Sequence, residues 1–388
     1  MAPADRPQVV AGSFVHLVYA FPSDGADGSA TVAAQISADV DEIDAWWRGQ
    51  DPTRTPRFDV FPYACGPQAD VTSVRLAQSG AQLAPIQSRA EQIAASLAAA
   101  GLGSSFGKYL VYYDGPSAEP GICGQSGLDA LAGPTYAFVY MGACDGVRTS
   151  AIAAHELIHA LGALPPGAPH ACADDDGHPC DSLQDILYPF ASGQPLLAHL
   201  LDVGRDDYYG HAGGWFDLQD SSWLRRLDAQ VPLSVSMQGG GTVRTLQPGP
   251  ECTAACTVEW DGGSTIQLDP VPAAGQRFVR WGGSCTGTTC SLQMTAPRSV
   301  TALFAPARFG LGVAVTGKGV VRSAPRGLAC SKRCSARFTS YQGVRLLATA
   351  QKGWRFRSWS GACAGARRTC TVPMRAASRV RATFVRRR

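Results

Sequence analysis

The stretch TSAIAAHELIHALGALPPGAPH, Thr149–His170, decides how the chain is interpreted. It contains His155, Glu156 and His159 in the pattern His-Glu-x-x-His, and Gly162 follows. Apolar residues fill most other positions up to Leu161, so we expect a helix over 149–161 that ends at the glycine. Residues four apart project from one face of a helix, about one turn apart. Both imidazoles can therefore bind the same metal ion.

This pattern predicts hydrolytic chemistry. Zinc bound by histidines lowers the pKa of a water molecule toward about 7. Glu156, next to the first ligand, can take the proton of that water and pass it to a leaving amine. The chain has only seven histidines and six glutamates, so the chance expectation of the motif is on the order of 0.002. The plainer alternative is an amphipathic helix that carries two histidines without a metal.

Zinc sites built on the His-Glu-x-x-His motif fall into classes that differ in their third ligand. No glutamate occurs between Glu156 and Glu251, which excludes a glutamate ligand from a later helix of the same domain. Gly162 lies three residues after His159, and here the segment resembles the metzincin metallopeptidases, whose motif is HExxHxxGxxH followed by a methionine-containing turn. The resemblance covers about 1–230 and is strongest over 149–188. It implies an α/β (α+β) catalytic domain with a mixed sheet and an active-site helix.

Two positions depart from that family's pattern. Pro165 stands where the family has its third histidine, and Leu187 stands where we place the methionine. Leucine nearly matches methionine in volume, so the second change removes no chemistry. The spacing is also similar to that of secreted actinobacterial metallopeptidase-like proteins with an extended loop. That resemblance favours His170 as the third zinc ligand.

Other residues remain candidates. His178 is the second choice for the third ligand, and an aspartate among Asp174–Asp176 is the third. The acidic runs 174–176 and 202–211 can also bind calcium, although a solvated loop is the more common role of such runs. The remaining histidines carry no spacing argument: we expect a buried core residue at His16 and assign no role to His199 and His211.

Periodicity predicts an alternating α/β head over 1–230. We expect strands within 14–21, 57–63, 71–77, 108–115 and 135–143, and helices over 31–49, 85–101, 149–161 and near 220–230. The rest of the chain is a tandem repeat, 233–307 and 308–388. Cys252, Cys256, Trp281 and Cys285 recur 78 residues later as Cys330, Cys334, Trp359 and Cys363. Short β-branched runs between glycine-rich turns predict two small all-β modules, which resemble divergent B-repeat-like domains of extracellular bacterial proteins.

Thirteen cysteines without zinc-knuckle spacing indicate disulfides and an oxidising compartment. We expect local pairs within each module (252 with 256, 285 with 290, and their equivalents) and Cys65 unpaired. Cys172 and Cys180 flank the candidate ligand loop, which a disulfide between them would stiffen. No run is apolar enough to cross a bilayer. The first ten residues lack a signal sequence, and the cysteines favour one that has been removed. We therefore expect a secreted bacterial protein that can associate with the cell wall, and a monomer.

Charge is distributed unevenly. Residues 1–232 carry 27 acidic and 11 basic residues, whereas 308–388 carry 19 basic and no acidic residues. Such a tail attracts polyanions, and we expect an anionic cell-wall polymer or polysaccharide and no specific nucleic acid. The predicted function is a zinc metalloendopeptidase acting on a protein or peptide. The alternatives are an inactive surface adhesin that retains zinc, and a zinc hydrolase of a non-peptide amide.

Overall fold

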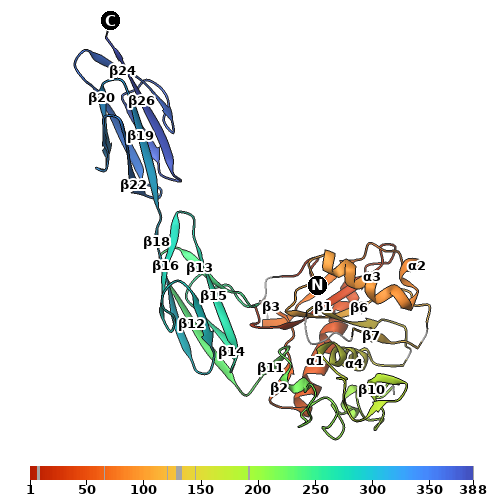
Figure 1. Cartoon of the computed structure of the whole chain (residues 1–388). Coiled ribbons are helices and arrows are strands. Elements are labelled where there is room, and N and C mark those ends of the chain that lie inside the picture. The colour runs from red at the N-terminus through yellow and green to blue at the C-terminus, as the bar shows by residue number, and fades with distance from the viewer. Residues whose placement is uncertain are drawn as a thin grey trace.

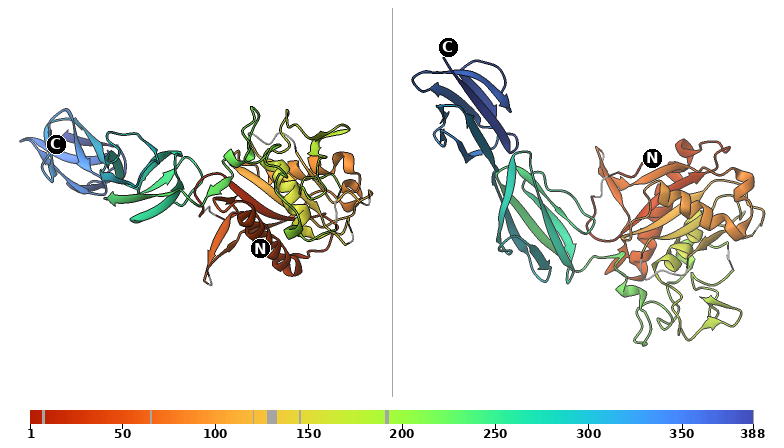
Figure 2. Two further views of the ribbon diagram at one scale, coloured as in Figure 1. Left: turned by 90° about the horizontal axis from the view of Figure 1, so that it is seen from below. Right: turned by 45° about the horizontal axis from the view of Figure 1, so that its top comes forward.

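The structure is a computed structural model that describes residues 1–6, 9–64, 66–119, 121–127, 133–144, 146–190 and 193–387. Figure 1 shows three bodies: an α/β head and two β modules that follow it in a row. The second module, hereafter module 2, lies farthest from the head, and the C-terminus is near its tip in every view (Figure 2). Strands make up most of the regular structure, and the longer helices lie in the head.

A five-stranded sheet forms the centre of the head. Its order is β5-β1-β6-β8-β7, from β5 (Val71–Arg75), β1 (Phe14–Phe21), β6 (Gly107–Tyr113), β8 (Thr135–Tyr140) and β7 (Gly124–Ser126). The first four strands are parallel, and β7 runs antiparallel along the edge. All residues of β1 and β6 are buried, because helices cover both faces of a largely parallel sheet.

Helices α1 (Ser29–Gln50) and α4 (Thr149–Leu161) cover one face, and α3 (Ile86–Ala99) with the short α2 (Gly80–Leu83) covers the other. Successive side chains of a strand point to opposite faces. Accordingly, Leu17 and Tyr19 belong to the core beneath α1 and α4, whereas Val18 and Ala20 belong to the core beneath α3. The sheet thus gives α4 a rigid, apolar support.

The predicted helix near 220–230 is wrong. A single turn, η2 (Leu218–Asp220), precedes β11 (Leu224–Arg226), which pairs with β2 (Arg54–Pro56). Trp223 and Leu224 are both buried in the head core, so packing and strand pairing override the helical spacing. The strand expected within 57–63 is β3 (Val60–Tyr63). The head also contains small elements that the sequence did not predict: β4 (Gly66–Ala69), β9 (Ala171–Cys172), β10 (Asp175–Pro179) and η1 (Leu196–Ala198).

Each module packs two antiparallel-rich sheets around its own core. Module 1 contains the sheets β14-β12-β18-β16 and β13-β15-β17. Its strands are β12 (Gln230–Gln238), β13 (Gly241–Thr245), β14 (Cys256–Asp261), β15 (Thr265–Pro272), β16 (Gln276–Gly283), β17 (Cys290–Gln293) and β18 (Arg298–Pro306).

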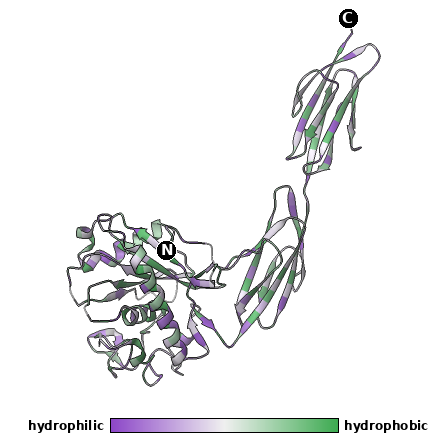
Figure 3. Cartoon of the chain, turned by 180° about the vertical axis from the view of Figure 1, so that it is seen from behind, coloured by the Kyte–Doolittle hydropathy of each residue, from purple (hydrophilic) through white to green (hydrophobic). Residues whose placement is uncertain are grey.

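Module 2 repeats this order as β22-β19-β26-β24 and β21-β20-β23-β25. Its strands are β19 (Arg308–Thr316), β20 (Gly319–Ala324), β21 (Ala329–Cys330), β22 (Arg333–Thr339), β23 (Gly343–Ala350), β24 (Trp354–Gly361), β25 (Thr369–Pro373) and β26 (Ser378–Arg386). The hydropathy colouring alternates along many of these strands (Figure 3), as expected for sheets with one buried and one solvated face.

Twelve cysteines form six disulfides. The four pairs predicted within the modules are confirmed. Cys172 and Cys180, which flank the candidate ligand loop, also form a disulfide. The sixth, Cys123–Cys144, links the segment before β7 to the loop after β8. Cys65, predicted to be unpaired, lies outside the described residues. Within the described part of the chain, no helix is long and apolar enough to span a membrane.

Asp51, which follows the last residue of α1, forms hydrogen bonds that connect the end of this helix to Tyr209 and Gln219. Its carboxylate accepts hydrogen bonds from the backbone and hydroxyl of Thr53, from Tyr209 and from Gln219. Burial opposes ionisation, but the Thr53 and Gln219 hydrogen bonds prevail and lower the pKa of Asp51 to about 2. A carboxyl group whose pKa is lower in the folded state stabilises that state above its unfolded pKa, and the effect is lost as the pH falls toward the folded pKa.

We therefore expect Asp51→Asn to lower the free energy of unfolding at pH 7 by about 1 kcal/mol after solvent screening. The difference from wild type should shrink between about pH 4 and pH 2, where the wild-type carboxylate also becomes protonated. Urea unfolding at pH 7, 4.5 and 3 measures this, with the exposed Asp220→Asn as the control. A difference that stays constant with pH would contradict the assignment.

Candidate metal centre

Helix α4 presents the motif from a fixed position. Eleven of its 13 residues are buried, and it packs on β8, on the edge strand β7 and on α1. The helix ends as predicted at Gly162, whose φ of +126° suits glycine. The Gly162 N–H donates to the carbonyl of His159, and the Ala163 N–H donates to that of Ile158. The chain therefore turns sharply after the second histidine of the motif.

Backbone carbonyls orient both motif imidazoles. His155 Nδ1 lies 2.7 Å from the carbonyl oxygen of Ile186, and His159 Nδ1 lies 2.8 Å from that of Ala163. A carbonyl oxygen only accepts hydrogen bonds, so each Nδ1 carries the proton and each Nε2 presents its lone pair. Burial is the main reason that the pKa of His155 lies well below its usual range and that of His159 falls to about 4. Both rings are therefore neutral, the state in which imidazole binds metals.

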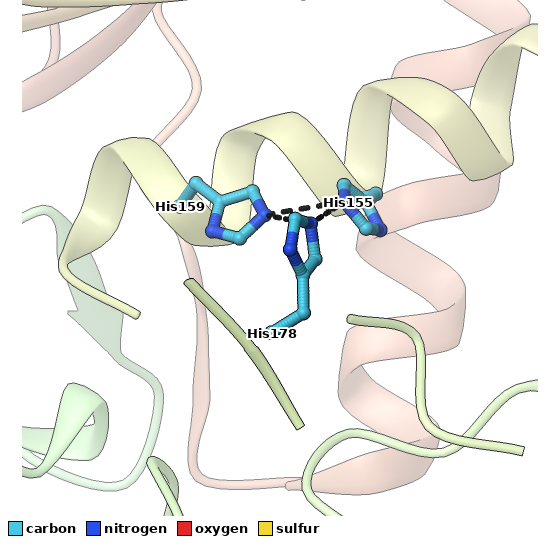
Figure 4. A group of neighbouring side chains, drawn as sticks. All are labelled: His155, His159 and His178. Atoms are coloured by element: carbon cyan, nitrogen blue, oxygen red, sulfur yellow. Dashed lines mark hydrogen bonds between the residues drawn. The ribbon is translucent and has the colours of Figure 1, made fainter. Parts of the chain in front are cut away.

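His178 completes the group. It lies on β10 of the β9–β10 hairpin, which the Cys172–Cys180 disulfide closes. Its Nε2 lies 3.2 Å from Nε2 of both His155 and His159, and those two atoms are 3.1 Å apart (Figure 4). Asp175 Oδ2 lies 2.8 Å from His178 Nδ1. The contact is at ion-pair distance and lacks hydrogen-bond geometry.

This geometry fits a zinc ion. Three nitrogens that bind one ion at 2.0–2.1 Å with tetrahedral angles are about 3.3 Å apart, close to the separations of the three Nε2 atoms. Because the Nδ1 atoms of His155 and His159 carry the protons, each Nε2 has a free lone pair. These two lone pairs face each other, an arrangement that only a shared proton or cation stabilises. The donor set, three imidazoles from two elements, is typical of a catalytic zinc site with an open fourth position.

The structure does not bring His170, the predicted third ligand, to His155 and His159. The backbone N–H of His170 donates to Asp207 Oδ1, its Nδ1 lies 3.1 Å from Asp207 Oδ2, and its carbonyl accepts from the Cys180 N–H. These bonds hold His170 at the base of the hairpin, grouped with Asp181 and Asp207. The chain then continues through β9 and returns along β10, which brings His178, the second candidate, to the helix.

The acidic residues predicted as alternative metal ligands lie in two segments of the head. Asp175 contacts His178, Asp174 is exposed, and the side chain of Asp176 lies outside the described residues. In the 202–211 run, the buried Asp202 carboxylate accepts backbone N–H groups of residues 206–209. That bonding organises the loop by itself, and calcium there stays a prediction.

His16 is the buried core residue expected from its strand. Its two ring nitrogens lie 3.0 Å from Asp59 and 2.8 Å from Thr72. His211, to which no role was assigned, stacks on Trp215 with ring centroids 4.8 Å apart.

Glu156 and the three histidines line a cavity of about 450 Å³. The glutamate is only 7% exposed, and burial raises the pKa of its carboxyl to about 8. It packs against the edge strand so closely that a Cβ on Gly124 would lie 2.6 Å from its Oε1. Glycine at this position lets strand β7 approach the carboxylate. A cation held by the histidines would favour the ionised form of Glu156.

The cavity has walls that the sequence analysis did not identify. The segment 121–126, which includes β7, lines it, and so does the loop after Leu187. Tyr188, Phe190 and His199 also line it, and Phe190 is 75% exposed. Strand β7 has only three residues, too few to show the alternation of apolar and polar residues that predicts a strand. The Cys123–Cys144 disulfide fixes its start.

Leu187 is the residue that the sequence places at the methionine position of the metzincin pattern. It is fully buried in the head core, and its N–H donates to Asp185. The preceding residue, Ile186, supplies the carbonyl that orients His155. An apolar side chain here therefore anchors the turn that fixes a candidate ligand.

Comparison with known proteins identifies the C-terminal modules. Residues 231–308 and 326–388 match the family described as "Divergent InlB B-repeat domain". The two modules are therefore similar to divergent B-repeat domains. The resemblance of the modules to B-repeat domains, expected from the sequence, is thus confirmed. The matched residues do not include the head. No curated protein matches the chain.

Two solved structures show a limited similarity. The crystal structure of the major pilin from Streptococcus pyogenes is 7% identical, with a TM-score of 0.16, over 40% of this chain and 96% of the pilin. The major pilin (T-13) from the S. pyogenes serotype GAS131465 is 10% identical, with a TM-score of 0.17, over 41% of this chain and 97% of the pilin.

Exchange of single histidines tests the composition of the centre. His178→Ala should lower zinc affinity at least about 100-fold, more than the loss of an outer hydrogen-bond partner usually costs. The matched change His170→Ala should leave zinc content unchanged, because His170 lies with Asp207 and not with the motif. Zinc content after dialysis against graded zinc buffers measures both. Loss of zinc in His170→Ala with retention in His178→Ala would contradict the geometry.

Substitution of Leu187 tests the apolar anchor. Leu187→Met should change the free energy of unfolding by less than about 1.5 kcal/mol, because the two side chains have similar volumes. Leu187→Ala leaves a cavity and should cost about 2–5 kcal/mol. Thermal and urea unfolding measure both variants. Equal stability of Leu187→Ala and wild type would show that the turn does not depend on this side chain.

Proposed function

We propose that the chain is a secreted zinc-dependent metallopeptidase whose metal ligands are His155, His159 and His178. The observation that carries the proposal is the convergence of three Nε2 atoms within 3.2 Å beside a buried glutamate at the wall of a cavity. Zinc bound there would act as a Lewis acid that lowers the pKa of water and polarises a carbonyl group.

The chain's own residues then supply proton transfer and positioning. Glu156 accepts a proton from the attacking water and delivers it to the leaving nitrogen. Its burial excludes bulk water from that transfer. Ile186 and Ala163 hold the two helix imidazoles through their carbonyls, and the Asp175 carboxylate lies beside His178 Nδ1. These contacts keep the ligand set in place before substrate binds.

A peptide is the substrate class that the cavity favours. The edge strand β7 lines it, and an extended peptide can add to the edge of a sheet through main-chain hydrogen bonds. A mostly parallel sheet with one antiparallel edge strand, followed by the HExxH helix, also agrees with the resemblance to metzincins. Leu187 and the position of the third histidine distinguish this chain from that family's usual pattern.

The two β modules support a role at a surface. Disulfides and the finding that no described helix could span a membrane are consistent with an extracellular protein. The 19 basic residues of module 2 would tether the head to an anionic surface. In Figure 1 module 1 separates the head from this basic module.

An inactive binding protein that retains zinc is the second candidate. The exposed Phe190 at the cavity favours it, because an exposed aromatic side chain can anchor a partner. Glu156 distinguishes the two, since a pure binding site has no need of a buried carboxylate next to the ligands. A zinc hydrolase of a non-peptide amide would use the same residues and would differ only in substrate.

The Glu156→Gln variant tests the proposal. It should bind zinc with wild-type stoichiometry, because the side chain at position 156 is not a ligand, and should lose about 10²–10⁴-fold in the rate of casein or gelatin cleavage. His211→Ala, a change remote from the helix, serves as the control and should keep full activity. Zinc bound by the wild type without cleavage of peptides would favour the inactive candidate.

A further inference from the structure

The outward face of the sheet β22-β19-β26-β24 in module 2 is lined with arginines. Arg333 and Arg337 on β22 are exposed, as are Arg379 and Arg381 on β26. The residues that alternate with them turn inward, and Phe338, Val380 and Ala382 are buried in the module core. The period of two puts the four guanidinium groups on one side of the sheet.

Strand β19 runs between these two arginine-bearing strands and carries small residues on the same face. Ala314 is in register with Arg333 on one side and with Arg381 on the other. Gly312 is in register with Arg379, and a Cβ on Gly312 would lie 3.7 Å from Arg379 Cγ. From strand geometry, the backbones of Arg333 and Arg381 are about 10 Å apart, and those of Arg379 and Arg381 are about 7 Å apart. The face is thus a low strip between two rows of positive charge, and we call it the arginine strip.

The module offers these charges no counter-charged side chain. Residues 308–388 contain 16 arginines, three lysines and no aspartate or glutamate. In module 1, by contrast, Arg244 pairs with Asp269, and Asp261 pairs with Arg57 of the head. Concentrated like charge on one sheet face costs repulsion, which binding of a polyanion relieves.

Module 1 provides an internal comparison. The repeat register places Ala255 and Glu259 where module 2 has Arg333 and Arg337, and Ser299 and Thr301 where it has Arg379 and Arg381. The strand order of the two sheets is the same, and Ser236 pairs with Thr301 as Ala314 pairs with Arg381. The shared fold therefore does not require the arginines.

We infer that the arginine strip binds a linear polyol-phosphate polymer, a chain of phosphodiesters joined by small alcohols. This inference rests on the proposed tethering and specifies its surface and ligand. Guanidinium groups match the geometry of phosphate in pairs of hydrogen bonds, and arginine outnumbers lysine 16 to three in this module. A slender chain can lie over the glycine and alanine floor while successive phosphates meet arginines on both sides.

The same face does not suit nucleic acid. Proteins that bind single strands combine positive charge with aromatic side chains on which bases stack. Among the described residues of module 2, the exposed large apolar side chains are Tyr341 and Leu347. Tyr341 lies in the turn between β22 and β23, and Leu347 lies on the other sheet. The strip thus offers charge without a stacking surface.

Binding of the full chain to purified poly(glycerol phosphate) tests the inference, by calorimetry or biolayer interferometry at several salt concentrations. Replacement of Arg333, Arg337, Arg379 and Arg381 by glutamine should weaken binding at least about 30-fold. The slope of log affinity against log salt should decrease in magnitude by about 3, because each phosphate contact to a flexible strand contributes about 0.7.

The matched control removes the same number of positive charges from another part of module 2, by replacing Arg322, Arg326, Arg345 and Arg368 with glutamine. These four arginines are exposed and lie on or beside the opposite sheet. This variant should bind within about threefold of wild type. Equal losses in the two variants would overturn the arginine strip while leaving general tethering intact, and no binding by wild type would overturn both. Tighter binding to a 20-nucleotide oligo(dT) or to polygalacturonate than to poly(glycerol phosphate) would overturn the ligand class. Circular dichroism of each variant verifies folding.

Discussion

The convergence of three imidazole Nε2 atoms is the constraint on which the rest of the head depends. The facing Nε2 lone pairs of His155 and His159 are unfavourable at this distance unless a proton or a cation lies between them, so the surrounding structure has to hold the rings in place. The carbonyls of Ile186 and Ala163 fix the two rings of α4, and a disulfide-closed hairpin delivers the third. Each of these supports comes from a turn or loop that is packed against the buried helix.

Burial of α4 explains why the site is rigid. The helix contacts the sheet, α1 and the edge strand, and most of its residues are inaccessible to solvent. The same packing places Glu156 against Gly124, where the strand has no side chain to separate them. A single helix therefore sets the positions of two candidate ligands, the carboxylate and one wall of the cavity.

Sequence alone could predict the local parts of this arrangement. His155, Glu156, His159 and Gly162 lie on one helix, so spacing and the glycine stop determine their relation. The repeat also predicted the module disulfides, because the paired cysteines are close in the chain. His178 could not be ranked above His170 by spacing, since the choice depends on Asp207, 37 residues beyond His170, which holds that histidine away. Likewise, the pairing of Leu224–Arg226 with Arg54–Pro56 is a contact between distant segments, which helical periodicity near 220–230 did not indicate.

A crystal structure of the zinc-loaded full chain, with an anomalous difference map at the zinc absorption edge, tests the proposed ligand set most directly. We predict one strong peak at about 2.0–2.1 Å from Nε2 of His155, His159 and His178. We also predict that His170 stays on Asp207, away from that peak. A peak bound by His170 in place of His178, or no peak beside α4 at saturating zinc, would contradict the proposed ligand set.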